Sequence, residues 1–273
     1  MHKIARGAPP LTLIGPEGPA MPGQPVLCTV NLALPRAYEV RAVRVEVWGV
    51  LRRVVGSLGW GPLRLWRWAT ERVIRTHHAL PIGHKLGPGT ASYRLEVPLP
   101  ADAPPTARGR MLQMVYTLRA RLDIPHAPDR WEVAPLRVHT SPPPWEGLPP
   151  SPREESISVR LEAPRTLVAG QRVQGSLALV ASHPVVLNDL RLDLVQRERV
   201  PPREWAFTVG RVAFPSVSLG AYAERVLSFS LGIPPQAPPT CVLPHHCSIQ
   251  WSLRLTARGY PRLAEVSVVV GTG

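Results

Sequence analysis

The 273-residue chain is short of long apolar runs, lysine and cysteine. No stretch approaches the roughly 20 apolar residues of a bilayer-spanning helix, so we expect no transmembrane segment. Proline and glycine interrupt the first apolar residues before a signal-peptide core can form. We therefore expect a cytoplasmic protein.

Segments free of proline and glycine are also scarce. The chain has 34 prolines and 21 glycines, and few windows of 12 residues lack both, which excludes long helices. Hydrophobic residues make up 44% of the chain and recur with a period of two where they are regular. Such a pattern predicts β-strands separated by proline rather than a disordered chain.

Motifs of common catalytic sites are missing as well. The sequence contains no G-x-S-x-G, H-E-x-x-H, G-x-x-x-x-G-K-[ST] or G-x-G-x-x-G. The Gly-rich stretch GHKLGPGT (83–90) precedes a strand instead of opening a helix, which is typical of a turn and not of a phosphate cradle. We predict no enzyme activity, no cofactor and no metal site.

Positive charge is abundant and comes almost wholly from arginine. Of the 32 basic residues only Lys3 and Lys85 are lysines, and the formal net charge is +13. Residues 1–150 carry 19 basic and 10 acidic side chains, and the remainder carries 13 and 9. An acidic partner would therefore bind the first half.

The sequence repeats itself. PGQPVLCTVNLAL (22–34) aligns without a gap on AGQRVQGSLALVA (169–181) at an offset of 147, and the same offset places VRVEV (43–47) on LRLDL (190–194). The phrase APPT occurs at 103–106 and again at 237–240, at an offset of 134. The pattern indicates an internal duplication in which the first copy carries 13 extra residues.

Each copy is typical of antiparallel strands with one apolar face, which need a second sheet to cover them. We predict an all-β fold of two tandem immunoglobulin-like β-sandwich domains, the first over residues 1–143 and the second over 156–273. A Pro-rich linker over 144–155 would join them as an extended, semi-rigid segment.

The order of these segments resembles the arrestin-like family. In the first copy it is carried by PGQ (22–24), VRAVRVEVWG (40–49), LGPGTASYRLEVPLPADAPPTA (86–107) and VYTLRARLDIP (115–125). In the second it is carried by VAGQRVQGSLAL (168–179) and IQWSLRLTARG (249–259). The sequence lacks a Pro-Pro-x-Tyr motif and is most similar to the compact prokaryotic arrestin-like proteins of the sporulation-control type. The resemblance implies a non-catalytic scaffold or adaptor.

The extra residues of the first copy fall in a segment rich in arginine and tryptophan. WGVLRRVVGSLGWGPLRLWRWATERVIRTHH (48–78) holds half of the eight tryptophans and six arginines against one acid. In a strand, Leu63, Leu65 and Arg67 would lie on the face opposite Arg64, Trp66 and Trp68. One interpretation is a hairpin in which arginine stems stack on tryptophan rings. The other is a contact surface, because both residue types are enriched at interface hot spots.

We predict that a protein partner, or a second copy in a homodimer, binds this segment. The predicted binding residues are Trp60, Arg64, Trp66, Arg67 and Trp68. The alternative is a charge-driven binder of nucleic acid or of an anionic membrane surface. Nucleic acid is disfavoured, because the charge is spread over both copies and no known nucleic-acid-binding module is present.

One further segment, CVLPHHC (241–247), holds four metal-binding side chains, Cys241, His245, His246 and Cys247. The favoured interpretation is a solvent-facing loop with free thiols, because C-x5-C is not a zinc-finger spacing. A metal site and a Cys241–Cys247 disulfide stay open as alternatives. Cys28 lies among inward-facing Val26, Val30 and Leu32 and is predicted to be a core residue.

Overall fold

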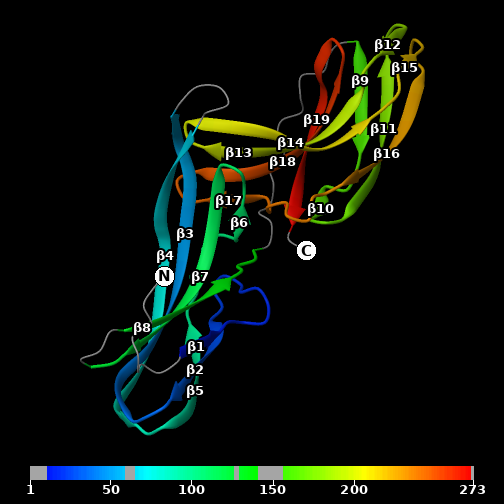
Figure 1. Cartoon of the computed structure of the whole chain (residues 1–273). Helices are drawn as coiled ribbons and strands as arrows, with labels where there is room; N and C mark the ends of the chain where they lie inside the picture. Colours follow the sequence, from blue (N-terminus) through cyan, green and yellow to red (C-terminus); the bar gives the residue numbers. More distant parts are fainter. Residues whose placement is uncertain (1–10, 59–64, 126–128, 141–155, 272–273) are drawn as a thin grey trace. The chain divides into compact units, whose positions relative to one another are not determined.

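The structure is a computed structural model that describes residues 11–58, 65–125, 129–140 and 156–271. The described residues form β-strands and no helix, so the predicted all-β class is confirmed (Figure 1). Several sheets are present, which is consistent with a β-sandwich. The described part of the chain contains no helix that is long and apolar enough to cross a membrane. The linker predicted over 144–155 lies outside the described residues.

The chain forms two compact units. Unit 1 contains Met1–Thr106 and Gln113–Thr140, and unit 2 contains Ala107–Leu112 and Ser141–Gly273. A short part of the first half, which includes β6 (Ala107–Arg108), thus belongs to unit 2.

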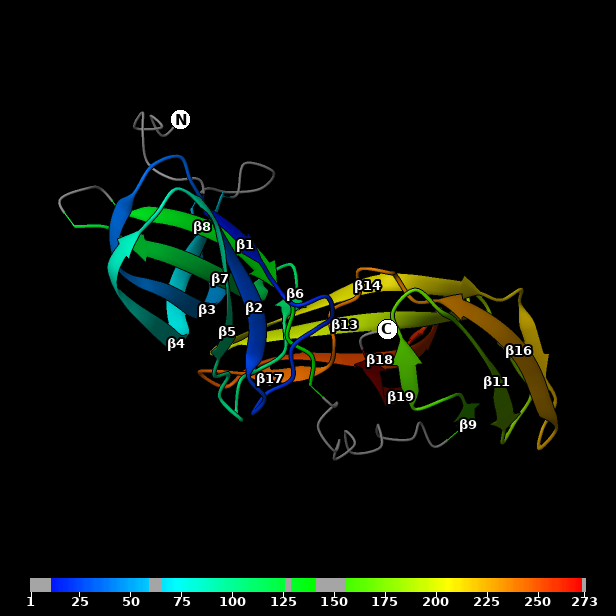
Figure 2. The ribbon, with the colours of Figure 1, turned by 90° about the horizontal axis from the view of Figure 1, so that it is seen from below.

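Two sheets make up unit 1. Its strands are β1 (Leu11–Ile14), β2 (Val26–Leu34), β3 (Tyr38–Leu58), β4 (Leu65–Leu86), β5 (Gly89–Val97), β7 (Leu112–Asp123) and β8 (Arg130–Leu136). The first sheet has the order β1-β2-β5, and the second has the order β4-β3-β7 with β8 paired to β7. In the view from below, β8, β7, β3 and β4 lie on one side of the unit and β1, β2 and β5 on the other (Figure 2).

The core of unit 1 lies between the inward faces of these sheets. Burial alternates along β2 and along β7, as a strand with one dry face requires. The buried side chains of the two strands are Val26, Cys28, Val30, Leu32, Leu34, Leu112, Met114, Tyr116, Leu118, Ala120 and Leu122. The predicted core position of Cys28 is confirmed, and burial raises the pKa of its thiol to about 11.

Unit 2 has a three-stranded sheet of order β16-β11-β9, a longer sheet of order β10-β19-β18-β13-β14 with β17 paired to β18, and the pair β12-β15. The strands are β9 (Ile157–Glu162), β10 (Thr166–Val168), β11 (Arg172–Ala181), β12 (Val185–Leu187), β13 (Arg191–Val200), β14 (Arg203–Ala213), β15 (Val217–Leu219), β16 (Glu224–Gly232), β17 (Cys241–Leu243), β18 (Cys247–Ala257) and β19 (Tyr260–Gly271). Its largest fully buried side chain is Trp251.

The Pro-rich phrase makes the same aromatic contact in both units. The Tyr116 hydroxyl donates a hydrogen bond to the Pro104 carbonyl at 2.7 Å, and the Trp251 indole N–H donates to the Pro238 carbonyl at 3.1 Å. Both rings are buried. An aromatic with a polar tip thus fixes each phrase against its core.

The threonine at the end of the Pro-rich phrase makes the same pair of hydrogen bonds in both units. The Thr106 N–H donates to the Val138 carbonyl, and the Val138 N–H donates back to the Thr106 hydroxyl. Thr240 and Val270 exchange the same two bonds at 2.8 Å each. These matching bonds agree with the predicted offset of 134 between the two phrases.

The two units differ most in one hairpin. The strands β3 and β4 have 21 and 22 residues, whereas β13 and β14 have 10 and 11 (Figure 1). The longer hairpin holds the arginine- and tryptophan-rich segment.

Candidate partner-binding surface

The structure describes three of the five residues predicted to bind a partner. Trp66, Arg67 and Trp68 lie near the start of β4, whereas Trp60 and Arg64 lie outside the described residues. Trp66 and Trp68 are half-buried and Arg67 is exposed, as the predicted alternation requires. The two tryptophans therefore lie on the opposite face of the hairpin from Arg67.

Trp68 packs on the outer face of the hairpin. It lies directly opposite Val54, which is buried, and the Arg52 guanidinium carbon is 5.5 Å from the centre of the Trp68 ring. Directly opposite residues of an antiparallel pair share a face, so the indole covers Val54. This part of the segment matches the interpretation in which arginine stems stack on tryptophan rings.

A longer row of arginine and tryptophan crosses the sheet. Arg72 of β4 stacks on Trp48 of β3 at 3.4 Å, and Arg119 of β7 stacks on the same ring at 3.7 Å. Arg119 also lies 5.9 Å from the ring centre of Trp131 on β8. Each strand is the hydrogen-bonded neighbour of the next. We call Trp48, Arg52, Trp68, Arg72, Arg119 and Trp131 the Arg/Trp surface.

Arg72 and Arg119 lie on opposite faces of the Trp48 ring. Two guanidiniums on one face, each within 4 Å of the ring centre, would overlap. Their carbon atoms are therefore about 7 Å apart, with the indole between them. Each contact contributes roughly 0.5 to 2 kcal/mol, depending on how dry it is.

Glu46 fixes the orientation of this indole. Its carboxylate accepts a hydrogen bond from the Trp48 ring N–H at 2.5 Å and another from Arg75 at 3.3 Å. Burial raises the pKa of Glu46, but these two bonds and the Arg75 charge outweigh it, so the pKa lies below the ordinary value. An ionised Glu46 thus holds the ring edge while both ring faces carry arginines.

Other arginines of this sheet have carboxylate partners. Arg44 pairs with Asp123 at 3.2 Å, and Arg75 pairs with Glu46. Arg121 pairs with Asp129. Among the described residues, no carboxylate lies within 4 Å of the guanidinium of Arg72 or Arg119. These two cations are therefore stacked on an aromatic ring but not neutralised by the sheet.

Of the six members of this surface, the sequence identified only Trp68 as a binding residue. Trp48, Arg52 and Arg72 lie within the segment singled out, but Arg119 and Trp131 lie more than 40 residues later. Strand pairing brings all six together. In TLRARLD (117–123), Arg119 and Arg121 alternate with apolar residues, and this pattern could have predicted that both arginines lie on the outward face of the strand.

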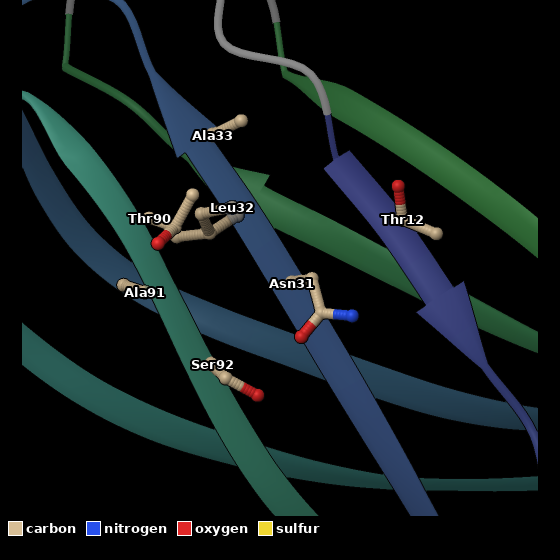
Figure 3. Close-up of a pocket in the computed structure, with 7 residues that line it drawn as sticks. All are labelled: Thr12, Asn31, Leu32, Ala33, Thr90, Ala91 and Ser92. Atoms are coloured by element: carbon tan, nitrogen blue, oxygen red, sulfur yellow. The ribbon is translucent and has the colours of Figure 1, made fainter.

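A shallow open hollow of about 310 Å³ lies on the other sheet of unit 1. Thr12, Asn31 and Ser92 come from the adjacent strands β1, β2 and β5 and lie in one row across it (Figure 3). The other lining residues are Leu32, Ala33, Thr90 and Ala91. None of these side chains is charged or aromatic, so the hollow offers no strong anchor for a ligand.

The interpretation of CVLPHHC as a solvent-facing loop is wrong in one respect. Cys241 and Cys247 do not form a disulfide, and both are buried. They lie on β17 and β18, where Cys241 pairs with Ile249 and Leu243 pairs with Cys247, so alternation turns both thiols inward. Burial raises the pKa of Cys241 to about 12. Such thiols are poor nucleophiles and poor metal ligands at neutral pH.

The two histidines form the turn between β17 and β18. His245 and His246 have φ values of 61° and 56°, and the Cys247 N–H closes the turn on the Pro244 carbonyl. Two central residues at positive φ define a turn that prefers Asn-Gly.

Replacing His245 with Asn and His246 with Gly is therefore expected to raise the free energy of unfolding of unit 2 by about 1 kcal/mol. Amide exchange of β17 and β18 would measure the change. The exposed His183, which lacks positive φ, supplies the control His183→Asn, for which we expect less than about 0.5 kcal/mol. Equal effects of both changes would contradict the assignment of strain to the turn.

No family model matches the chain, and no curated protein matches it either.

Proposed function

We propose that the protein is a non-catalytic, arrestin-like scaffold or adaptor whose Arg/Trp surface binds a protein partner. Its two units would be tandem immunoglobulin-like sandwiches. The order of sequence segments and the matching bonds of the two Pro-rich phrases support this architecture.

The main support for this proposal is the row of stacked arginine and tryptophan side chains across β4, β3, β7 and β8. Arginine and tryptophan dominate binding hot spots because each offers a large contact area together with donor groups. Trp131 is 46% exposed, and the Arg72 guanidinium stacks on the Trp48 ring without a carboxylate partner among the described residues. A rigid β-sheet holds these side chains in register, so a partner would meet a preformed surface.

Affinity capture from extracts of the source organism tests the proposal. We expect wild type to retain a defined protein that the Trp68→Ala, Trp131→Ala double variant loses, because two of the three indoles of the Arg/Trp surface are removed. Tyr222→Ala is the matched control, because Tyr222 is the most exposed large hydrophobic side chain among the described residues of unit 2, at 79%. The same captured proteins on all three baits would contradict a role for the Arg/Trp surface.

The dependence of binding on ionic strength distinguishes this function from charge-driven binding of nucleic acid or membrane. Binding dominated by phosphate contacts falls by orders of magnitude between low and moderate ionic strength. A partner held by stacked rings and a few ion pairs should be retained at moderate ionic strength. Loss of the captured protein at moderate salt, together with capture of nucleic acid at low salt, would favour the charge-driven binder instead.

A further inference from the structure

Arg119 of unit 1 and Arg254 of unit 2 occupy equivalent positions. Each lies three residues after the aromatic that bonds a Pro-rich phrase, Tyr116 in one unit and Trp251 in the other. Both arginines lie on the outward face of their sheet, on β7 and β18 respectively. The two units can therefore be compared at this position.

Unit 2 neutralises its arginine with an internal acid. Arg254 lies directly opposite Glu265 of β19, and its guanidinium is 3.4 Å from the Glu265 carboxylate. Unit 1 has Val133 of β8 at the place opposite Arg119. Val133 is 49% exposed and carries no charge, so it cannot replace the carboxylate that Glu265 provides in unit 2. The equivalent cation, Arg119, has no carboxylate partner among the described residues.

Arg72 provides a second guanidinium beside the same Trp48 ring. The two guanidiniums flank Trp48 about 7 Å apart, and stacking on a ring uses none of their N–H groups. Glu46, the nearest acid to the indole, is already bonded to the Trp48 N–H and to Arg75. Ten N–H donors, five on each guanidinium, thus flank one ring, and neither guanidinium has a carboxylate partner among the described residues.

We propose that Arg72 and Arg119 together bind two acidic side chains of an extended segment of the partner protein. The inference rests on the proposed function and names the chemistry of the partner. Alternate residues of a strand lie on one side of the chain, roughly 6.5 to 7 Å apart. Two carboxylates at such positions match the spacing of the two guanidiniums, each of which can bind a carboxylate through two N–H groups.

The same geometry disfavours single-stranded nucleic acid. Proteins that bind unpaired bases stack them on free aromatic faces. Both faces of Trp48 are covered by guanidiniums, so no base can stack there.

A peptide-binding titration with the full chain tests the inference. The probe is a fluorescein-labelled ten-residue peptide of alternating Glu and Thr, and the reference is the same peptide with Gln in place of Glu. We expect saturable binding of the acidic peptide only. Arg72→Gln and Arg119→Gln should each weaken it at least tenfold, because each removes one two-bond contact with a carboxylate.

Val133 provides the sharpest variant pair. Val133→Glu restores the acid that unit 2 has at this position, so it should neutralise Arg119 internally and weaken peptide binding at least tenfold. Val133→Gln has the same size without the charge and should bind like wild type. Arg225→Gln, which removes an exposed positive charge of unit 2, should also bind like wild type. These variants change exposed positions, so they report on binding even if Arg72→Gln fails to fold.

Three outcomes would overturn the inference: equal binding by Val133→Glu and Val133→Gln, equal binding of the Glu and Gln peptides, and tighter binding of a dT10 oligonucleotide or of phosphatidylserine vesicles than of the acidic peptide. If the peptide fails while the captured protein still depends on Trp68 and Trp131, this inference alone is wrong. If the capture also loses that dependence, the proposed function is wrong as well.

Discussion

Replacing Glu265 with alanine is expected to lower the free energy of unfolding of unit 2 by about 3 to 5 kcal/mol. The Glu265 side chain is 4% exposed and pairs with Arg197 at 2.7 Å, with Arg254 at 3.4 Å and with Arg262 at 3.4 Å. The Ser252 hydroxyl donates to it as well. Removing the carboxylate leaves Arg197, whose side chain is 18% exposed, with the more exposed Glu204 as its remaining carboxylate partner among the described residues.

The pH dependence of this effect has a defined sign. Burial raises the pKa of Glu265, but the bonds from Arg197 and Ser252 and the charges of Arg197 and Arg254 outweigh burial, and the pKa is lowered. A carboxyl with a lowered pKa stabilises the fold above its unfolded value of about 4.3, and this contribution is lost as the pH falls through the lowered pKa. The difference between wild type and variant should therefore shrink below about pH 4.

Native-state amide exchange of β18 and β19 would measure this change for unit 2 separately. Glu162→Ala is the matched control, because Glu162 pairs with Arg160 on the same unit but is 62% exposed. We expect a loss of about 0 to 1 kcal/mol for the control. Similar losses for the two variants would contradict the importance of the buried cluster.

Replacing Glu198 with alanine is expected to lower the free energy of unfolding of unit 2 by about 2 to 4 kcal/mol and to free the turn within Ala107–Leu112. The Glu198 carboxylate is fully buried and accepts hydrogen bonds from the backbone N–H groups of Arg110 and Met111 at 2.7 and 2.8 Å. The Gln196 amide donates a third bond at 2.6 Å. Alanine would leave these buried donors without an acceptor.

Glu198 should show the opposite pH trend to Glu265. Burial raises its pKa more strongly than the hydrogen bonds lower it. A carboxyl with a raised pKa contributes stability that is complete below its unfolded value and is lost as the pH rises through the folded value. The loss caused by Glu198→Ala should therefore be larger at pH 4 than at pH 8.

Amide exchange at Arg110 and Met111 gives the direct readout of the Glu198 prediction. We expect at least tenfold faster exchange in Glu198→Ala, and unchanged exchange in Glu204→Ala, whose side chain is 49% exposed. Unchanged protection of both amides in Glu198→Ala would show that the carboxylate does not hold the turn.

Local sequence patterns predicted much of the fold. The alternation in VLCTVNLAL places Val26, Cys28 and Val30 in the core because a strand has a period of two. The repeated APPT located equivalent anchors, since its proline carbonyl and threonine bond in the same way in both units. The extra length of the first copy pointed to the hairpin of β3 and β4.

The candidate surface could be predicted only in part, because it depends on long-range pairing. The composition of 48–78 identified the hairpin but not the register that places Arg119 and Trp131 beside Trp48. For the same reason Cys241 and Cys247 were expected to face solvent. Only the register of β17 against β18 reveals that both thiols point inward.

Site-specific photo-crosslinking tests the location of the partner surface most directly. A photoreactive phenylalanine at Thr70, which is exposed and lies opposite Arg52, would report on the Arg/Trp surface. The same residue at Val186, which is 55% exposed on unit 2, would serve as the control. We expect a crosslinked protein from the native extract at Thr70 that disappears when Arg72→Gln and Arg119→Gln are added. Crosslinking at Val186 alone, or at Thr70 without dependence on the two arginines, would contradict the proposed surface.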